Sequence, residues 1–280
     1  MDRLLTFWRA NTPDLWGDQQ DKNYGEKMLY LTLYKDLFNV GYIKLAKSFN
    51  VNVKLHPNTL SHNVKLIRRV LRGWAESVIT LGDSDEWNGA VRNVKLGKLI
   101  KNANLWIDST DLPLCRGKGR GKKSEFWSYK LNSPGRRYMI LRDGHMKIRA
   151  IWGGYSPKVF DGHWLEMHKW WLETNLKGGV ILGDCHFAWG RGHLSNPVVH
   201  APFPETFTDE TADNGANLSK LTAEQQRYNR QVKKARARLE NVFGQWKNKW
   251  DSFRAKWQED VEELDNVLWI AAGIYNCQLD

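Results

Sequence analysis

Apolar residues recur at the spacing of an α-helix through the N-terminal third of the chain. Residues 27–38 and 41–49 both show this spacing, and a polar break that contains Pro57 follows them. The pattern resumes over residues 59–71, so three helical segments are expected in this part of the chain.

The third of these segments has an apolar side and a basic side. Lys65, Arg68 and Arg69 lie opposite its apolar residues, as in the second helix of a helix-turn-helix DNA-binding motif. A small helical cap that only packs on the next part of the chain would show the same pattern. Both interpretations stay open for a helical, helix-turn-helix-like domain over residues 1–90, in which these three cations are candidate DNA contacts.

A change of pattern follows this region. Residues 82–90 are polar and rich in turn formers, and we expect them to form the hinge between two domains. Several short segments beyond it have the pattern of strands, and a turn is expected at residues 133–135. The predicted strands are residues 104–110, 125–131, 137–141 and 147–152, of which the last three would form a meander.

The C-terminal half combines helices with one more apolar strand. Residues 161–176 have a helical stripe, residues 179–182 form a wholly apolar strand, and residues 187–217 are irregular. A long charged helix over residues 223–249 and an amphipathic helix over residues 261–275 complete the chain. This order of elements predicts a mixed α/β domain over residues 91–280.

The chain is strongly basic. Lys and Arg number 42 against 31 for Asp and Glu, which gives a formal net charge of +11. An excess of this size favours polyanionic partners such as nucleic acid. Five cations lie in a glycine-rich loop whose backbone could approach phosphate groups, although a solvated loop would look the same. They are Arg116, Lys118, Arg120, Lys122 and Lys123.

Composition also argues against several classes of protein. Cys115, Cys185 and Cys277 lie far apart in the sequence without a Cys-x-x-Cys pair, which favours neither a disulfide framework nor a structural zinc site. No run of apolar residues approaches the length needed to cross a bilayer. We therefore expect an intracellular protein that does not act in a membrane.

Two aspartates stand at the ends of apolar strands. Asp108 follows the apolar residues 105–107, and Asp184 follows residues 180–183. A carboxylate in such a position is costly unless a cation or hydrogen bonds compensate its charge. Adjacent parallel strands would bring the two side by side, at the sheet edge where ligands bind in open α/β folds. Asp111 is the alternative to Asp108.

A third acid lies within the long charged helix. At about 100° per residue, Glu240 shares a stripe with Lys233, Arg236 and Lys247, and this stripe flanks the buried one. The helix could therefore offer one carboxylate to a metal ion and its cations to a DNA backbone. The alternative is an ordinary surface glutamate paired with Arg236 at i−4.

Two aspartates and a glutamate suit one kind of chemistry. Mg²⁺ prefers oxygen ligands and is commonly held by a few carboxylates together with phosphate oxygens. Two such ions about 4 Å apart can activate a water or a 3′-hydroxyl and stabilise the leaving oxygen in phosphodiester cleavage. Asp108, Asp184 and Glu240 are therefore the predicted catalytic and metal-binding residues, with two Mg²⁺ or Mn²⁺ ions as cofactors.

The segments that carry these acids resemble the signature blocks of DDE endonucleases, and in particular the PIF/Harbinger group of transposases. They are residues 107–110, 182–185 and 238–247. Residues 152–161, which end at an aspartate before a helix, resemble another segment of that family. The resemblance extends from about residue 99 to the end of the chain, and the helix-turn-helix-like region also suits the family.

The resemblance implies a fold and an activity. The fold would be RNase H-like, a mixed sheet flanked by helices, with Asp108 on the first strand and Asp184 after the fourth. The activity would be cutting of DNA at transposon terminal inverted repeats, followed by joining of the 3′-hydroxyl to target DNA. A dimer or higher oligomer is implied, the family allows for a Myb-like accessory protein, and in a eukaryotic host the protein would act in the nucleus.

Two alternatives to a transposase remain. A domesticated relative could keep the fold as a DNA-binding protein that does not cut, and a plain metal-dependent nuclease would cut without joining ends. The presence of all three acids favours retained chemistry but does not separate cutting from strand transfer.

Overall fold

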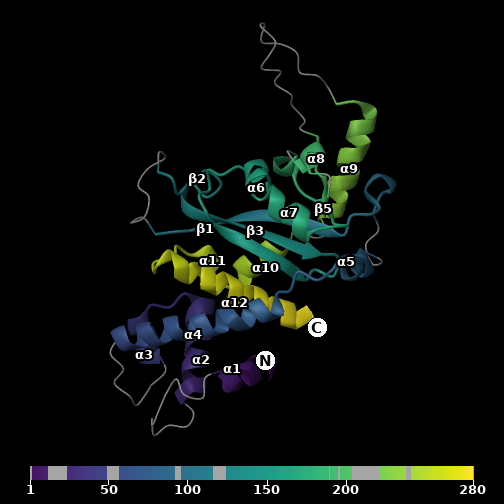
Figure 1. Cartoon of the computed structure of the whole chain (residues 1–280). Coiled ribbons are helices and arrows are strands. Elements are labelled where there is room, and N and C mark those ends of the chain that lie inside the picture. Colours follow the sequence, from purple (N-terminus) through teal and green to yellow (C-terminus); the bar gives the residue numbers. More distant parts are fainter. Residues whose placement is uncertain are drawn as a thin grey trace.

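A mixed β-sheet lies in the centre of the molecule between layers of helices (Figure 1). The mixed α/β class expected from the order of elements is thereby confirmed. The computed structural model describes residues 2–11, 24–48, 57–91, 96–115, 124–188, 190–194, 196–203, 221–237 and 241–279.

The sheet has the order β2-β3-β1-β5-β6, and β4 also pairs with β3. The β1–β3 and β3–β4 pairs are antiparallel, whereas the β1–β5 and β5–β6 pairs are parallel. Residues on both faces of β5 pack in hydrophobic clusters, as in parallel strands covered on both sides. The strands are β1 (Leu105–Pro113), β2 (Trp127–Ser128), β3 (Ser133–Asp143), β4 (Ile148–Tyr155), β5 (Val180–Leu182) and β6 (Val198–His200).

One face of the sheet is covered by α6 (Asp161–Met167) and α7 (Lys169–Asn175). Leu105 and Ile107 of β1 pack there against helix residues such as Leu165. The short helix α8 (Gly190–His193) and α5 (Ser84–Val91) lie beside this layer in Figure 1. Alternate residues of β1 point to opposite faces, so Trp106 and Leu112 face the other side.

The opposite face is covered by C-terminal helices. Near one end of β1, Trp106 packs with residues of α9 (Ala223–Ala237). Further along the strand, Leu112 belongs to the same buried cluster as residues of α10, α11 and α12. These helices are α10 (Asn241–Lys249), α11 (Asp251–Arg254) and α12 (Val261–Leu279).

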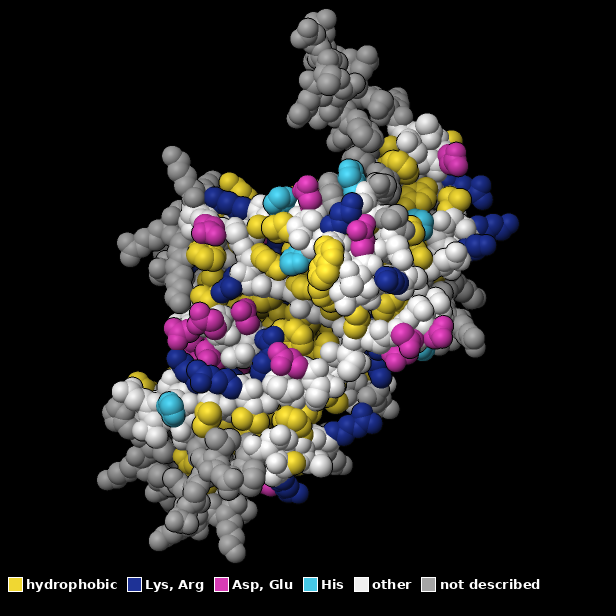
Figure 2. Space-filling model, in the orientation of Figure 1, with side chains coloured by type: hydrophobic (Ala, Val, Ile, Leu, Met, Phe, Trp, Pro, Cys, Tyr) yellow, Lys and Arg dark blue, Asp and Glu magenta, His cyan; other side chains and the backbone are white. Residues whose placement is uncertain are grey.

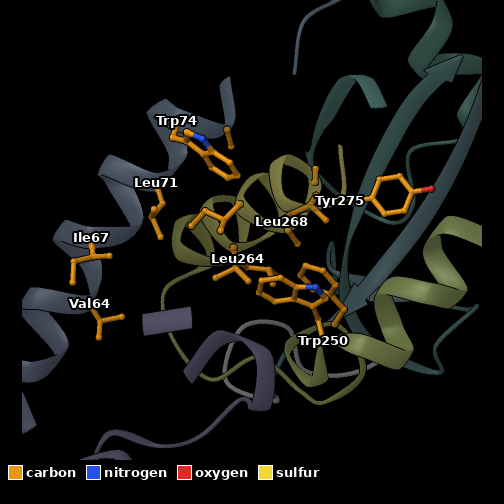
Figure 3. Close-up of a cluster of buried hydrophobic side chains, with 14 of the residues drawn as sticks. Val64, Ile67, Leu71, Trp74, Trp250, Leu264, Leu268 and Tyr275 are labelled. Atoms are coloured by element: carbon orange, nitrogen blue, oxygen red, sulfur yellow. The ribbon is translucent and has the colours of Figure 1, made fainter. Parts of the chain in front are cut away.

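Among the N-terminal helices, α4 packs on α12, whereas α1, α2 and α3 pack on α4 (Figure 1). Figure 3 shows Leu71 and Trp74 of α4 directed towards Leu264 and Leu268 of α12. One continuous hydrophobic core thus joins the N-terminal helices, α12 and the lower face of the sheet. The N-terminal helices are α1 (Asp2–Asn11), α2 (Tyr24–Phe38), α3 (Tyr42–Ser48) and α4 (Pro57–Val78).

The predicted basic side of α4 does not hold for Arg68, whose side chain is 0% exposed. Its guanidinium pairs with Asp36, with Glu259 at 2.7 Å and with Glu263 at 3.2 Å. Arg68 is therefore a buried counter-ion for acids of α2 and the α12 region, and the prediction that it contacts DNA is wrong.

The expected hinge over residues 82–90 is also wrong in part, because α5 occupies most of it. The Asp83 carboxylate accepts hydrogen bonds from the backbone N–H groups of Asp85 and Glu86, both at 3.0 Å, which stabilises the start of this helix. Trp87 is buried, and Glu86 pairs with Arg149 of β4 at 2.7 Å. These contacts attach the segment to the sheet layer.

Several other boundaries differ from the expected ones. Residues 133–135 belong to β3 instead of forming a turn, since Gly135 pairs with Pro113 of β1. The strand expected over residues 125–131 is only the two-residue β2, so β1, β3 and β4 make up the antiparallel meander. The stretch expected to be irregular contains β6, whose pairing with β5 is not evident from local pattern.

One predicted helix is divided, and a second is described only in part. The segment over residues 161–176 breaks at His168, which has φ −102° and ψ 10° and lies 2.9 Å from the Tyr155 hydroxyl. The segment over residues 223–249 forms α9 and α10, and residues 238–240 lie outside the described part of the chain. None of the described helices combines the length and apolarity of a bilayer-spanning segment.

The burial of Arg68 predicts a large loss of stability on its removal. Arg68→Ala should lower the free energy of unfolding by about 3–5 kcal/mol, because Asp36 and Glu263 would stay buried without their cation. The adjacent Arg69 is exposed, and Arg69→Ala should change it by less than about 0.5 kcal/mol. Urea denaturation of both variants measures the difference, and equal effects would contradict the role given to Arg68.

The lowered pKa of Glu259 predicts the pH range in which acid destabilises the protein. Burial opposes its ionisation, but the Arg68 and Lys35 cations outweigh burial and lower its pKa from 4.5 to about 2. Its charge therefore stabilises the fold above pH 4.5, by up to about 3 kcal/mol, and this contribution is lost as the pH falls towards 2. In urea denaturation, Glu259→Gln should be less stable than the wild type at pH 7, and the gap should close near pH 2. A gap independent of pH would contradict this account.

Candidate active site

The register of β1 and β5 determines where the two predicted aspartates lie. The parallel pairs are Leu105 with Ile181 and Trp106 with Leu182. Trp106 and Leu182 share a buried cluster with Val232 of α9, so both side chains point to the α9 side of the sheet. Alternation along β1 then directs Asp108, two positions beyond Trp106, to the same side, and Asp184 follows Leu182 by two positions, just past the end of β5.

The two predicted acids are Asp108 and Asp184. Each carboxylate accepts a backbone hydrogen bond through Oδ1, from Ser109 at 2.9 Å and from His186 at 2.8 Å respectively. Asp184 has an extended backbone, with φ −77° and ψ −176°, and begins a short 3-10 helix over Cys185–Phe187. The expectation that adjacent parallel strands bring the two acid-bearing segments together is confirmed.

The environment of Asp108 disfavours its charge. Burial raises its pKa, and the nearby Asp184 carboxylate raises it further. Arg236 and the Ser109 N–H act in the opposite direction but do not cancel these effects. The Arg236 Nη2 atom lies 4.0 Å from Asp108 Oδ1, too far for a good hydrogen bond. A cation bound between the two carboxylates would relieve the unfavourable charge.

Asp111, the alternative to Asp108, has a different environment. Its side chain is buried and accepts hydrogen bonds from Arg137 Nε at 2.8 Å and from Ser128 Oγ at 2.6 Å. Its charge is thus already compensated inside the protein, which makes Asp108 the better partner for Asp184.

Several predicted site residues lie outside the described part of the chain. They are Glu240 and the loop cations Arg116, Lys118, Arg120, Lys122 and Lys123. Within the described ranges, no group of three or more His, Cys, Asp or Glu side chains is placed to hold a metal ion. The described part of the site is therefore a pair of acids with neighbouring cations.

The predicted DNA-binding cations fall into two places. Arg236 lies at Asp108, Lys233 is exposed on the same helix, and Lys247 of α10 donates to the Asp111 carbonyl at 3.4 Å. Burial lowers the pKa of Lys247, and the charge of Lys130 lowers it further. Away from the acids, Lys65 pairs with Asp260 at 2.8 Å.

Arg69, the remaining predicted cation, is exposed on α4 in the layer beyond α12. Figure 2 shows acidic and basic side chains interspersed over one face of the molecule, without a single unbroken basic surface. On this face, therefore, the positive charge does not gather in one patch.

The sequence did not predict a buried polar network behind Asp108. Ser109, Arg137 and Asp161 are joined there by hydrogen bonds, with Ser109 Oγ donating to Asp161 Oδ2 at 2.9 Å. One signal pointed to it, because Asp161 closes the segment of residues 152–161 that resembles a DDE block. The partners come from β1, β3 and α6, so local spacing could not connect them.

The proximity of Arg236 predicts a measurable effect on Asp108. Arg236→Gln should raise the Asp108 pKa further, because the substitution removes a positive charge that lowers it. Lys234→Gln is the matched control, an exposed cation of the same helix. Carbon-13 NMR titration of the Asp108 carboxyl in metal-free protein measures the shift. An unchanged pKa in Arg236→Gln, or an equal rise in both variants, would contradict the geometry.

Comparison with known families agrees with this geometry. The family of DDE superfamily endonucleases matches residues 107–276, more than half of the chain, and the match begins one residue before Asp108. Neither curated proteins nor solved structures gave a match. Members of this superfamily are endonucleases that act on DNA and generally use divalent metal ions. The chain belongs to the DDE superfamily endonucleases.

Proposed function

We propose that this protein is a DNA transposase in which Asp108, Asp184 and Glu240 hold two Mg²⁺ or Mn²⁺ ions. The observation that carries the proposal is that Asp184 directly follows the strand paired in parallel with the Asp108 strand, while the charge of Asp108 is only partly compensated. Structural acids are usually neutralised by a close cation, as Asp111 is by Arg137. Acids left without full compensation are typical of functional sites.

The side chains fit the proposed metal ions. Carboxylate oxygens are the ligands that Mg²⁺ and Mn²⁺ prefer, and the nearest cation, Arg236, stands 4.0 Å from Asp108 Oδ1. When bound, the two ions would supply an activated water or 3′-hydroxyl and stabilise the leaving oxygen. The protein's own part is to hold the carboxylates in place and to bind the phosphate backbone with cations.

Glu240 is proposed as the third acid from two lines of support. It lies within the family match over residues 107–276, and it follows Arg236 by four residues in the sequence. In the helix that the sequence predicts over residues 223–249, residues separated by four positions would share one side, and Arg236 is the α9 residue that lies at Asp108.

The finer assignments belong to the same proposal. The strand order β4-β3-β1-β5-β6, with Asp108 on β1 and Asp184 just after β5, supports an RNase H-like fold. We propose the PIF/Harbinger group as the subtype, a helix-turn-helix-like domain over residues 1–90 and the nuclease domain over residues 91–280. Dimerisation, a Myb-like accessory protein and action in the nucleus follow from the same subtype.

Cations near the acids would contact the DNA backbone. Arg236 lies 4.0 Å from Asp108, Lys233 acts electrostatically on Cys185 beside Asp184, and Lys247 interacts with Asp108, so we assign these three to phosphates next to the cut. Lys65 and Arg69 on α4, together with the basic loop over residues 116–123, would contact DNA further away. Terminal inverted repeats and target DNA are the proposed substrates.

The proposal predicts complete dependence on the three acids. Asp108→Asn, Asp184→Asn and Glu240→Gln should each reduce cleavage of a labelled duplex carrying candidate transposon ends, with Mg²⁺ or Mn²⁺, by more than about a hundredfold. A loss of that size exceeds the one typical of residues that only orient a ligand. Binding to the same duplex should persist. Glu224→Gln, which changes an exposed acid of α9, is the control and should cut like the wild type.

The products separate the competing functions. Joined 3′ ends support a transposase, whereas free ends or nicks alone support a plain metal-dependent nuclease. Binding without cutting under either ion supports a domesticated DNA-binding protein. Cleavage that survives substitution of the acids would contradict the site.

A further inference from the structure

The turn that leads into α6 is linked to both acid-bearing segments. On one side, the Asp161 Oδ2 atom accepts a hydrogen bond from Ser109 Oγ at 2.9 Å. The backbone N–H of the same Ser109 donates to Asp108 Oδ1 at 2.9 Å. Ser109 therefore connects Asp161, through its side chain, with Asp108, through its backbone.

The neighbouring Phe160 contacts the segment that carries the other acid, Asp184. Its ring meets the His186 ring edge to face, with centroids 5.5 Å apart and an angle of 86° between the planes. The backbone N–H of His186 donates to Asp184 Oδ1 at 2.8 Å. Phe160 is 51% exposed, so its contact with His186 is not a consequence of burial in the core.

The turn itself is anchored to the sheet by one guanidinium. Arg137 Nη1 donates to the Val159 carbonyl at 2.9 Å and to Asp161 Oδ1 at 3.3 Å, and Nε donates to Asp111 at 2.8 Å. Asp161 is 3% exposed, and both of its oxygens are engaged in these contacts. It is thus placed to hold the turn and not to bind a metal ion.

Strand pairing alone does not hold the two acids together. β5 is three residues long, and only two residue pairs join it to β1. Asp184 lies two residues beyond the last of these pairs, Trp106 with Leu182. The two negative charges also repel each other, and this repulsion would separate segments that are not held elsewhere.

We propose that Phe160 and Asp161 are positioning residues that hold Asp108 and Asp184 at the separation needed to share metal ions. The inference rests on the proposed function of the two acids. The dipeptide links the middle of β1, at Ser109, to His186 of the Cys185–Phe187 helix, and Arg137 fixes this link to β3. Its contribution is mechanical, since neither side chain is a ligand.

A matched pair of serine variants tests the contact between Asp161 and Ser109. Ser109→Ala removes the hydroxyl that donates to Asp161, whereas Ser128→Ala removes a buried hydroxyl that donates to Asp111. Both substitutions delete a buried hydrogen bond to an aspartate paired with Arg137, and Ser128→Ala also removes the acceptor of the Leu131 N–H, but only Ser109 also contacts Asp108. Mn²⁺ affinity, measured by electron paramagnetic resonance, and the Mg²⁺ concentration for half-maximal cleavage are the readouts.

Ser109→Ala is expected to weaken Mn²⁺ binding and to raise the Mg²⁺ requirement about tenfold, the range known for residues that orient a metal ligand. Ser109→Thr, which keeps a hydroxyl, should show nearly wild-type Mn²⁺ binding and a nearly wild-type Mg²⁺ requirement. Phe160→Leu should weaken Mn²⁺ binding several-fold at unchanged thermal stability, because the ring is half-exposed. Ser128→Ala should bind Mn²⁺ like the wild type.

The possible results distinguish failure of the positioning role from failure of the proposed function. Suppose the wild type, Ser109→Ala and Phe160→Leu all bind Mn²⁺ and cut DNA at the same ion concentrations. That result overturns the positioning role and leaves the proposed function intact. Equal losses in Ser109→Ala and Ser128→Ala overturn it too, because they indicate general destabilisation. A wild type that neither binds Mn²⁺ nor cuts overturns the proposed function and this inference with it.

Discussion

The two-residue parallel pairing between β1 and β5 is the constraint on which the site depends. It sets Trp106 beside Leu182, the packing of both against α9 selects the face towards which Asp108 points, and Asp184 follows directly after the paired strand. The same packing brings Arg236 of α9 to 4.0 Å from Asp108. Hydrophobic burial, which is non-directional in itself, thereby positions two charged groups that would otherwise repel each other.

Two kinds of buried charge occur in this chain and lead to opposite conclusions. Arg68 is wholly buried and paired with acids from distant segments, so it links the N-terminal helices to the α12 region. Asp108 is partly buried, and Arg236, the cation beside it, stands 4.0 Å away. A charge whose partners are complete holds the fold together, whereas a charge whose partners are incomplete indicates a place for an ion from outside the chain.

Local pattern predicted the parts of this protein that depend on near neighbours. Most of the helices and the apolar strands β1 and β5 follow from periodicity within about ten residues, and Asp184 follows β5 as expected, whereas Asp108 lies within β1, which continues to Pro113. The Asp161 network could not be predicted in this way, because Ser109 and Arg137 come from different strands. Arg68 was assigned to a solvent-facing basic side because its partner Glu259 lies far along the chain. The third predicted acid, Glu240, stays a prediction.

The central claim is that Asp108 and Asp184 share a divalent ion. Anomalous X-ray diffraction from crystals soaked in Mn²⁺ tests it most directly, because the ion's position is measured without reference to activity. The account predicts a manganese peak within coordination distance of carboxylate oxygens from both residues, about 2.0–2.3 Å. Manganese bound elsewhere, with both carboxylates ordered and no peak between them, would contradict the account.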